Sequence, residues 1–157
     1  MRSFVLGLTL LAGCCGYSTS SLLPSHLKTV AVTPATNTTT QPGLAEALTD
    51  ELTTAFSSDR TLRVTNAEAA DLVVSAAVSG YTRNASSYTG DQAVSAYEVS
   101  VSAQIEARDQ TRDEEFYSGT ASARVTYDPN AKTEEQAAAD ALKKLASEIV
   151  RQVQIAW

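Results

Sequence analysis

The stretches YEVSVSAQIEA (residues 97–107) and YSGTASARVTY (residues 117–127) decide the fold of this chain. In both, small or apolar residues occupy the odd positions and mostly polar residues the even ones. Successive side chains of a strand point to opposite faces, so each stretch predicts a strand with one apolar face. The polar residues 108–114 between them are short enough for a hairpin. One-sided alternation of this kind is typical of an antiparallel sheet with one covered face and one face open to water.

A third alternating stretch runs from Asp71 to Arg83. Leu72, Val74, Ala76 and Val78 share one face, and Ser75, Ser79 and Tyr81 are expected on the other. Upstream, the β-branched run of residues 28–33 predicts a short first strand that ends at Pro34. Residues 35–40, rich in Asn and Thr, are expected to form a loop, and residues 62–65 a short extended piece.

Two helices are predicted on either side of the alternating strands. The first spans about residues 43–57, with Pro42 suited to its first turn and Thr40 or Gln41 as its cap. Its apolar stripe consists of Leu44, Leu48, Leu52 and Phe56. The second follows a capping box of Thr133 and Gln136. Its stripe consists of Ala138, Leu142, Leu145, Ile149 and Val153. The expected fold is α+β: a two-layer sandwich of two helices on one face of a mostly antiparallel sheet, in the order β-α-β-β-β-α.

The N-terminus has the features of a bacterial lipoprotein leader. Arg2 precedes a short apolar run, and residues 11–17 read Leu-Ala-Gly-Cys-Cys-Gly-Tyr. The run is too short to span a bilayer, for which about 20 apolar residues are needed. We therefore expect a signal peptide at residues 1–13, a lipidated N-terminus and tether at 14–27, and one folded domain at 28–157. Several acyl chains on one cysteine anchor a protein stably to a membrane.

The lipid is expected on one of two adjacent cysteines. Cys14 has the better upstream residues, because Cys15 would have a cysteine directly before its own cleavage site. We therefore predict Cys14 as the lipidation site and keep Cys15 as the alternative. The sequence has no other cysteine. The folded domain is thus expected to have neither a disulfide framework nor a thiolate metal site.

Composition and motifs argue against nucleic-acid binding and against catalysis. The net charge is −6, whereas binding to nucleic acid needs a cationic surface. His26 is the only histidine, and we interpret it as a solvated loop residue rather than a catalytic base. Asp109, Asp113 and the two glutamates that follow are expected to form a solvated hairpin turn. The sequence predicts no enzyme activity, no metal site and no cofactor.

One polar segment has two open interpretations. Residues 83–91, Arg-Asn-Ala-Ser-Ser-Tyr-Thr-Gly-Asp, are expected to form a loop between Tyr81 and the next strand. The loop is either an exposed connection without a further task or a contact site for a partner or an amphiphile, because loops on rigid scaffolds often carry binding residues.

Several segments, in this order, resemble the LPS-assembly lipoprotein family, LptE. They are Cys-Gly-Tyr after the lipobox, Leu-Pro-Ser-His-Leu-Lys-Thr-Val-Ala-Val at 23–32, Pro-Gly-Leu at 42–44, Ala-Asp-Leu-Val-Val at 70–74, Tyr-Glu-Val-Ser-Val-Ser-Ala at 97–103 and Tyr-Asp-Pro at 127–129. The resemblance implies a lipid-anchored outer-membrane protein that faces the periplasm. It would plug the lumen of an LptD-type β-barrel, help that barrel to assemble, and contact lipopolysaccharide on its way to the cell surface.

The resemblance also implies two sites of contact with lipopolysaccharide. Family members carry a basic residue just before the second helix, and Lys132 matches it here. A second basic position lies in the loop before the long strand, where this chain has Thr89, with Arg83 nearby. Lys132 and Arg83 are therefore the candidates for lipopolysaccharide binding.

A second class of function is kept open by the sequence. Other lipoproteins that face the periplasm share a lipobox and a short first strand followed by a helix in a small α+β fold. Such a protein would be an adaptor that activates or scaffolds another envelope complex, for example a cell-wall synthase. An envelope hydrolase is disfavoured, because no catalytic constellation is present.

Overall fold

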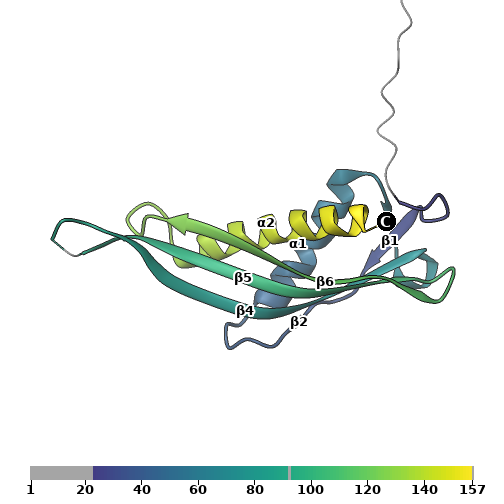
Figure 1. The fold of residues 1–157 in the computed structure, drawn as a ribbon, viewed down its shortest axis with the longest axis horizontal. Helices are drawn as coiled ribbons and strands as arrows, with labels where there is room; N and C mark the ends of the chain where they lie inside the picture. The colour runs from purple at the N-terminus through teal and green to yellow at the C-terminus, as the bar shows by residue number, and fades with distance from the viewer. Residues whose placement is uncertain (1–22, 92, 157) are drawn as a thin grey trace, which may run out of the picture.

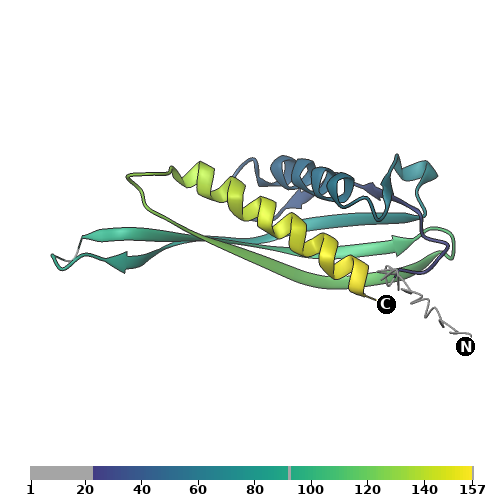
Figure 2. The same ribbon diagram turned by 90° about the horizontal axis from the view of Figure 1, so that it is seen from above.

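The described part of the chain forms one mixed sheet with two helices on one of its faces (Figures 1 and 2). It comes from a computed structural model that describes residues 23–91 and 93–156. The expected signal peptide and both cysteines lie outside these residues. The elements are β1 (Thr29–Val32), β2 (Thr36–Asn37), α1 (Leu44–Asp59), β3 (Arg63–Val64), a 3₁₀ turn (Ala67–Ala69), β4 (Leu72–Tyr88), β5 (Val94–Asp109), β6 (Glu114–Tyr127) and α2 (Glu134–Ile155).

The predicted two-layer α+β sandwich is confirmed. The sheet order is β3-β1-β4-β5-β6, and β2 also pairs with β4. The long strands β4, β5 and β6 are antiparallel neighbours, whereas the short strands β1, β2 and β3 join the sheet by parallel pairing. The sheet is therefore mixed, with its antiparallel part in the three strands that alternation predicted.

The apolar rows of the strands and the apolar stripes of the helices meet in one core. The odd positions of β5 from Val99 to Ala107 are buried, as are Ala121, Ala123 and Val125 of β6. From the helices, Leu48, Leu52, Leu145 and Ile149 are fully buried. Small side chains on the sheet let α2 pack closely on β5 and β6. The capping box at Thr133 and Gln136 is present and fixes where α2 begins.

One residue inserted into β4 corrects the predicted face of Tyr81. The pairing with β5 shifts between Val78 and Gly80, so that Ser79 is extra on the β4 side. A β-bulge of this kind moves the side chains that follow it to the opposite face, as far as the next register shift. Tyr81 therefore lies on the helix side and not with Ser75, where simple alternation had put it. Its hydroxyl donates a hydrogen bond to Glu134 of α2.

Three local predictions were wrong. Residues 83–88 do not belong to a loop but continue β4, which pairs with β5 as a two-stranded arm that extends beyond the helices (Figure 1). Part of the expected loop 35–40 forms β2, which gains its partner only by tertiary pairing with β4. The cap of α1 is neither Thr40 nor Gln41 but Gly43, whose φ of 79° is a left-handed conformation that glycine adopts at no steric cost.

Neither helix of the described residues lies on the second face of the sheet (Figure 2). Gln104 and Glu106 of β5 and the even residues of β6 from Ser118 to Thr126 are exposed there. Among the described residues, no helix is both long enough and apolar enough to cross a membrane. The domain therefore presents to its surroundings a broad face of small hydroxyl, amide and charged side chains.

Candidate functional site

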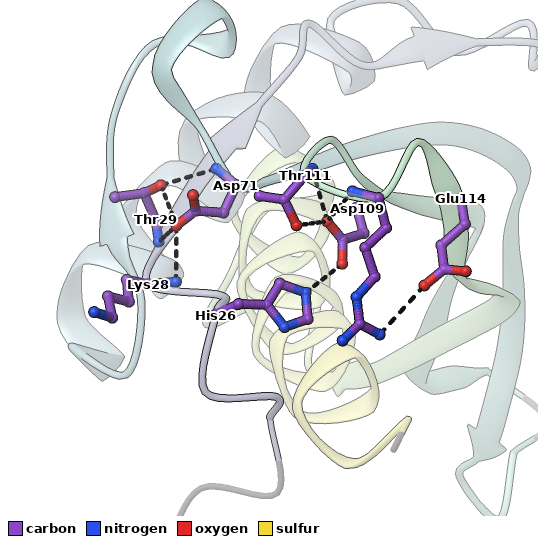
Figure 3. Close-up of polar contacts among 8 residues, drawn as sticks. His26, Lys28, Thr29, Asp71, Asp109, Thr111 and Glu114 are labelled. Carbon is purple, nitrogen blue, oxygen red and sulfur yellow. Dashed lines mark hydrogen bonds and ion pairs between the residues drawn. The ribbon is translucent and has the colours of Figure 1, made fainter.

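Two polar clusters lie at opposite ends of β5, and the first fastens the N-terminal segment to the domain (Figure 3). His26 Nε2 lies 2.5 Å from Asp109 Oδ2, a contact between residues 83 positions apart. On either side of it, Leu23 and Leu27 are buried in the core. The last residues of the expected tether are thus held against the end of the sheet. The interpretation of His26 as a solvated loop residue was wrong, because its side chain is only 27% exposed.

Asp109 is the acceptor at the centre of this cluster. It is 1% exposed and accepts hydrogen bonds from the backbone N–H and hydroxyl of Thr111 and from the N–H of Arg112. Burial raises the pKa of its carboxyl group, but the hydrogen bonds from His26, Thr111 and Arg112 outweigh burial and lower the pKa to about 2. The expectation that Asp109 lies in a solvated turn was therefore wrong. Because the ionised carboxylate only accepts, His26 Nε2 is the donor.

Asp71 forms the other half of the fastening. Its Oδ2 accepts hydrogen bonds from the backbone N–H groups of Lys28 and Thr29 and from the Thr29 hydroxyl, which in turn accepts from the Asp71 N–H. The bond from the Lys28 backbone is the main cause that lowers the pKa of Asp71, and burial opposes it. These bonds fix the start of β1 beside the start of β4. We name residues 23–29 with Asp71 and Asp109 the N-terminal clasp.

The clasp has the chemistry of a structural fastening. Within residues 23–91 and 93–156, the one side-chain partner of the His26 imidazole is Asp109. Across the same residues, no three His, Cys, Asp or Glu side chains gather closely enough to hold a metal ion. A signal for the clasp did exist in the sequence, since Asp109 continues the odd, apolar row of β5.

The second cluster surrounds Arg83, at the point where the β4–β5 arm leaves the body. The Arg83 guanidinium lies 3.7 Å from the centroid of the Tyr97 ring. Its Nε donates to the Tyr127 hydroxyl at 2.8 Å and lies 3.2 Å from Glu134 Oε2. Tyr97 and Tyr127 stack with centroids 5.9 Å apart. Burial, followed by the bond to Glu134, raises the pKa of Tyr81. Side chains from β5, β6 and α2 thus all contact the guanidinium group of Arg83 on β4.

Lys132 lies at the same end of the domain. It precedes α2, and its ammonium group forms an ion pair with Asp140, which lies within α2. That bond is the main cause that lowers the pKa of Asp140. Glu134, the partner of Arg83, is only two residues from Lys132, so the two sequence-predicted candidates flank the start of α2. Each is about two-fifths exposed and can still be reached from solvent. Arg83 itself belongs to β4 and not to a loop.

The two clusters are far apart. Tyr97 and Asp109 lie on the same strand, and twelve residues of extended chain span about 40 Å. The clasp (Figure 3) therefore fastens one end of the domain, and the β4–β5 arm extends from the other (Figure 1). Arg83 and Lys132 lie at the end from which the arm extends, beside the start of α2. Sequence reasoning found the second cluster in part, through its two basic residues. It missed how the tyrosines gather there: Tyr97 and Tyr127 are cross-strand partners of β5 and β6, and the bulge in β4 turns Tyr81 and Arg83 to the same face.

Fold and clusters define the class of this protein: a small two-layer α+β domain with one open, polar sheet face and a fastened N-terminal segment. Within that class, the sequence profile of the lipopolysaccharide-assembly family LptE matches residues 27–154. The chain belongs to the LptE family, which confirms the resemblance seen in the sequence. Comparison with curated protein sequences gives no match.

Solved structures with the same fold have little sequence in common with this chain. The hypothetical protein CT253 from Chlamydia trachomatis superposes with a TM-score of 0.61 at 13% identity, covering 82% of this chain and 96% of that one. Protein XCC0632 from Xanthomonas campestris gives 0.59 at 13% identity, with coverages of 85% and 90%. The PelC dodecamer from Paraburkholderia phytofirmans gives 0.58 at 19% identity, with coverages of 87% and 96%. At these identities the likeness concerns the fold alone.

Proposed function

We propose that this chain is an outer-membrane lipoprotein that plugs the lumen of an LptD-type β-barrel, helps the barrel to assemble, and contacts lipopolysaccharide during its delivery to the cell surface. It acts as a non-enzymatic partner in a heterodimer and is anchored through a lipid on Cys14. One observation carries the proposal: in an LptE-family domain, one sheet face is mostly polar and has no helix among the described residues on it. The interior wall of a large outer-membrane barrel is polar and wet, so such a face suits it without burying unpaired apolar surface.

The contact with lipopolysaccharide is assigned to the end that carries Lys132 and Arg83. The phosphates of lipopolysaccharide are anions that Lys binds as a point charge and Arg binds with its planar fork. Both cations have carboxylate partners in the free chain, Asp140 and Glu134. A phosphate would therefore replace or share an existing partner, and the free energy gained is the difference between the two pairings.

Co-purification tests the main proposal. The full-length chain, carrying an affinity tag, is extracted in detergent from outer membranes, and the proteins retained with it are identified by mass. We expect a very large β-barrel protein to be retained, in an amount equal to that of the tagged chain. Recovery of a glycosyltransferase without a barrel would contradict the proposal and favour the adaptor function instead.

Charge reversal tests the lipid contact separately. Lys132→Asp is expected to weaken binding of purified lipopolysaccharide to the chain several-fold, because an attraction to phosphate becomes a repulsion. Lys28→Asp makes the same change in net charge at the other end of the domain and serves as the control. Circular dichroism establishes that both variants are folded. Equal binding by wild type and Lys132→Asp would remove Lys132 from the site.

A further inference from the structure

Within residues 23–91 and 93–156 no strand pairs with the outer edge of β6, and this edge has few of the features that prevent pairing. β6 is the last strand of the sheet and has fourteen residues, Glu114–Tyr127. Its stretch from Ser118 to Ala123 contains neither a charged residue nor proline. The pairing of β5 with β6 shifts only near the start of β6, between Ala107 and Arg108. Edge strands that stay unpaired are usually short, bulged, charged or interrupted by proline. A long edge whose central stretch has none of these devices is suited to receive another strand.

The hydrogen bonds of the sheet determine which amides of β6 point outward. The carbonyl groups of Val74 and Val78 accept from Thr33 and Thr38, so the even residues of this part of β4 face β1 and β2. The odd residues of β4 then face β5, and in an antiparallel pair two facing residues exchange both bonds. Following the register, the even residues of β5 face β4 and its odd residues face β6. The odd residues of β6 therefore bond to β5, and Ser118, Thr120 and Ser122 direct their N–H and C=O groups outward.

A groove runs beside this edge. It has a volume of about 550 Å³ and lies between Val125 of β6 and the outer side of α2, which packs on β6. Lys143, Lys144, Glu148 and Arg151 line it together with Asp140. Glu148 is matched by Arg151 and Asp140 by Lys132. In the part of the chain that the structure describes, Lys143 and Lys144 form no ion pair. The excess charge of the groove is therefore positive.

We infer that β6 and this groove receive an extended, acidic segment of a partner protein, which adds to the sheet as a further strand. The backbone of the segment pairs with the outward groups of Ser118, Thr120 and Ser122, and its carboxylates reach Lys143 and Lys144. The identity of the partner rests on the proposed function. Because every strand of a closed barrel is already paired on both sides, the added strand must come from a loop or a terminal segment of the barrel protein.

Proline substitution tests the strand pairing. Ser122→Pro removes one outward N–H and leaves the bonds to β5 in place, while Ser122→Ala changes the side chain and keeps the N–H. With the co-purification described above, the proline variant is expected to retain at least about tenfold less barrel than wild type, and the alanine variant as much as wild type. Lys143→Glu combined with Lys144→Glu is expected to weaken retention and to make it less sensitive to salt.

Amide hydrogen exchange on the wild-type chain tests the same pairing without a substitution. In the free chain, Ser118, Thr120 and Ser122 exchange fast while Gly119 and Ala121 are protected; in the complex, all five are protected. Fast exchange of the even residues in the complex, or full retention of the barrel by a folded Ser122→Pro variant, overturns this inference and leaves the proposed function intact. Protection by lipopolysaccharide alone, or by dimerisation of the free chain, also overturns it. A wild-type chain that retains no barrel overturns both.

Discussion

The buried carboxylate of the clasp makes a quantitative prediction for stability against pH. The pKa of Asp109 is about 2 in the folded chain and 3.8 in the ordinary side chain. At about 1.4 kcal/mol for each pKa unit, the ionised form stabilises the fold by about 2 kcal/mol. Above pH 5 this contribution is complete, because Asp109 is charged both folded and unfolded. It is lost as the pH falls from about 5 to 2, where the unfolded chain takes up the proton first.

Urea unfolding, followed by far-UV circular dichroism at several pH values, measures this contribution in wild type and in Asp109→Asn. The other carboxylates titrate equally in both proteins. The difference in free energy of unfolding between wild type and Asp109→Asn therefore isolates the titration of Asp109. We expect the gap at pH 6 to shrink by about 1.6 kcal/mol at pH 2.5, since part of the contribution remains above the folded pKa. Asp113 lies in the same turn, but its side chain is 86% exposed. The free energy of unfolding of Asp113→Asn should therefore depend on pH as that of wild type does. A gap between wild type and Asp109→Asn that is constant over this range would refute the reasoning.

Two further predictions concern the helices. Leu48 is fully buried, so Leu48→Ala should lower the free energy of unfolding by about 2–5 kcal/mol in urea, and a loss under about 1 kcal/mol would contradict the packing of α1. Thr133→Ala removes the side chain that accepts from the Gln136 N–H and should cost about 1 kcal/mol by the same measurement, whereas Thr126→Ala on the open sheet face, with its exposed side chain, should cost less.

The elements that the sequence predicted are those whose pattern is local. Alternation over ten residues defined β5 and β6, and a stripe with its capping box defined α2. The two-residue strand β2 has no such pattern, since it exists only through its pairing with β4. The arm beyond Arg83 was misassigned because β4 pairs there only with β5 and its side chains are mostly exposed, so the sequence shows no alternating apolar row. A single extra residue, Ser79, then changed the face of the residues from Gly80 to Ala85, where the register with β5 shifts again.

The candidate sites show the same difference between local sequence patterns and contacts that only the folded chain creates. Lys132 and Arg83 were identified as single basic residues, but their common location depends on the contact between β4 and α2. The alternation of β5 indicates that Asp109 faces the core, but its pairing with His26 joins positions 83 residues apart, and no local pattern names that partner. The open edge of β6 could not be found before the strand order was known, because alternation defines the faces of a strand and not its neighbours.

The most direct measurement of the central claim is the accessibility of the open sheet face in the assembled complex. Gln104 is exposed on this face, in the middle of β5, so Gln104→Cys in a Cys15→Ser chain places a thiol there. The rate of its reaction with a polyethylene-glycol maleimide is compared in the free chain and in the complex extracted from outer membranes. If the face lies against the wall of a barrel lumen, the reaction is strongly slowed in the complex. Equal rates in the free chain and the complex would contradict the account.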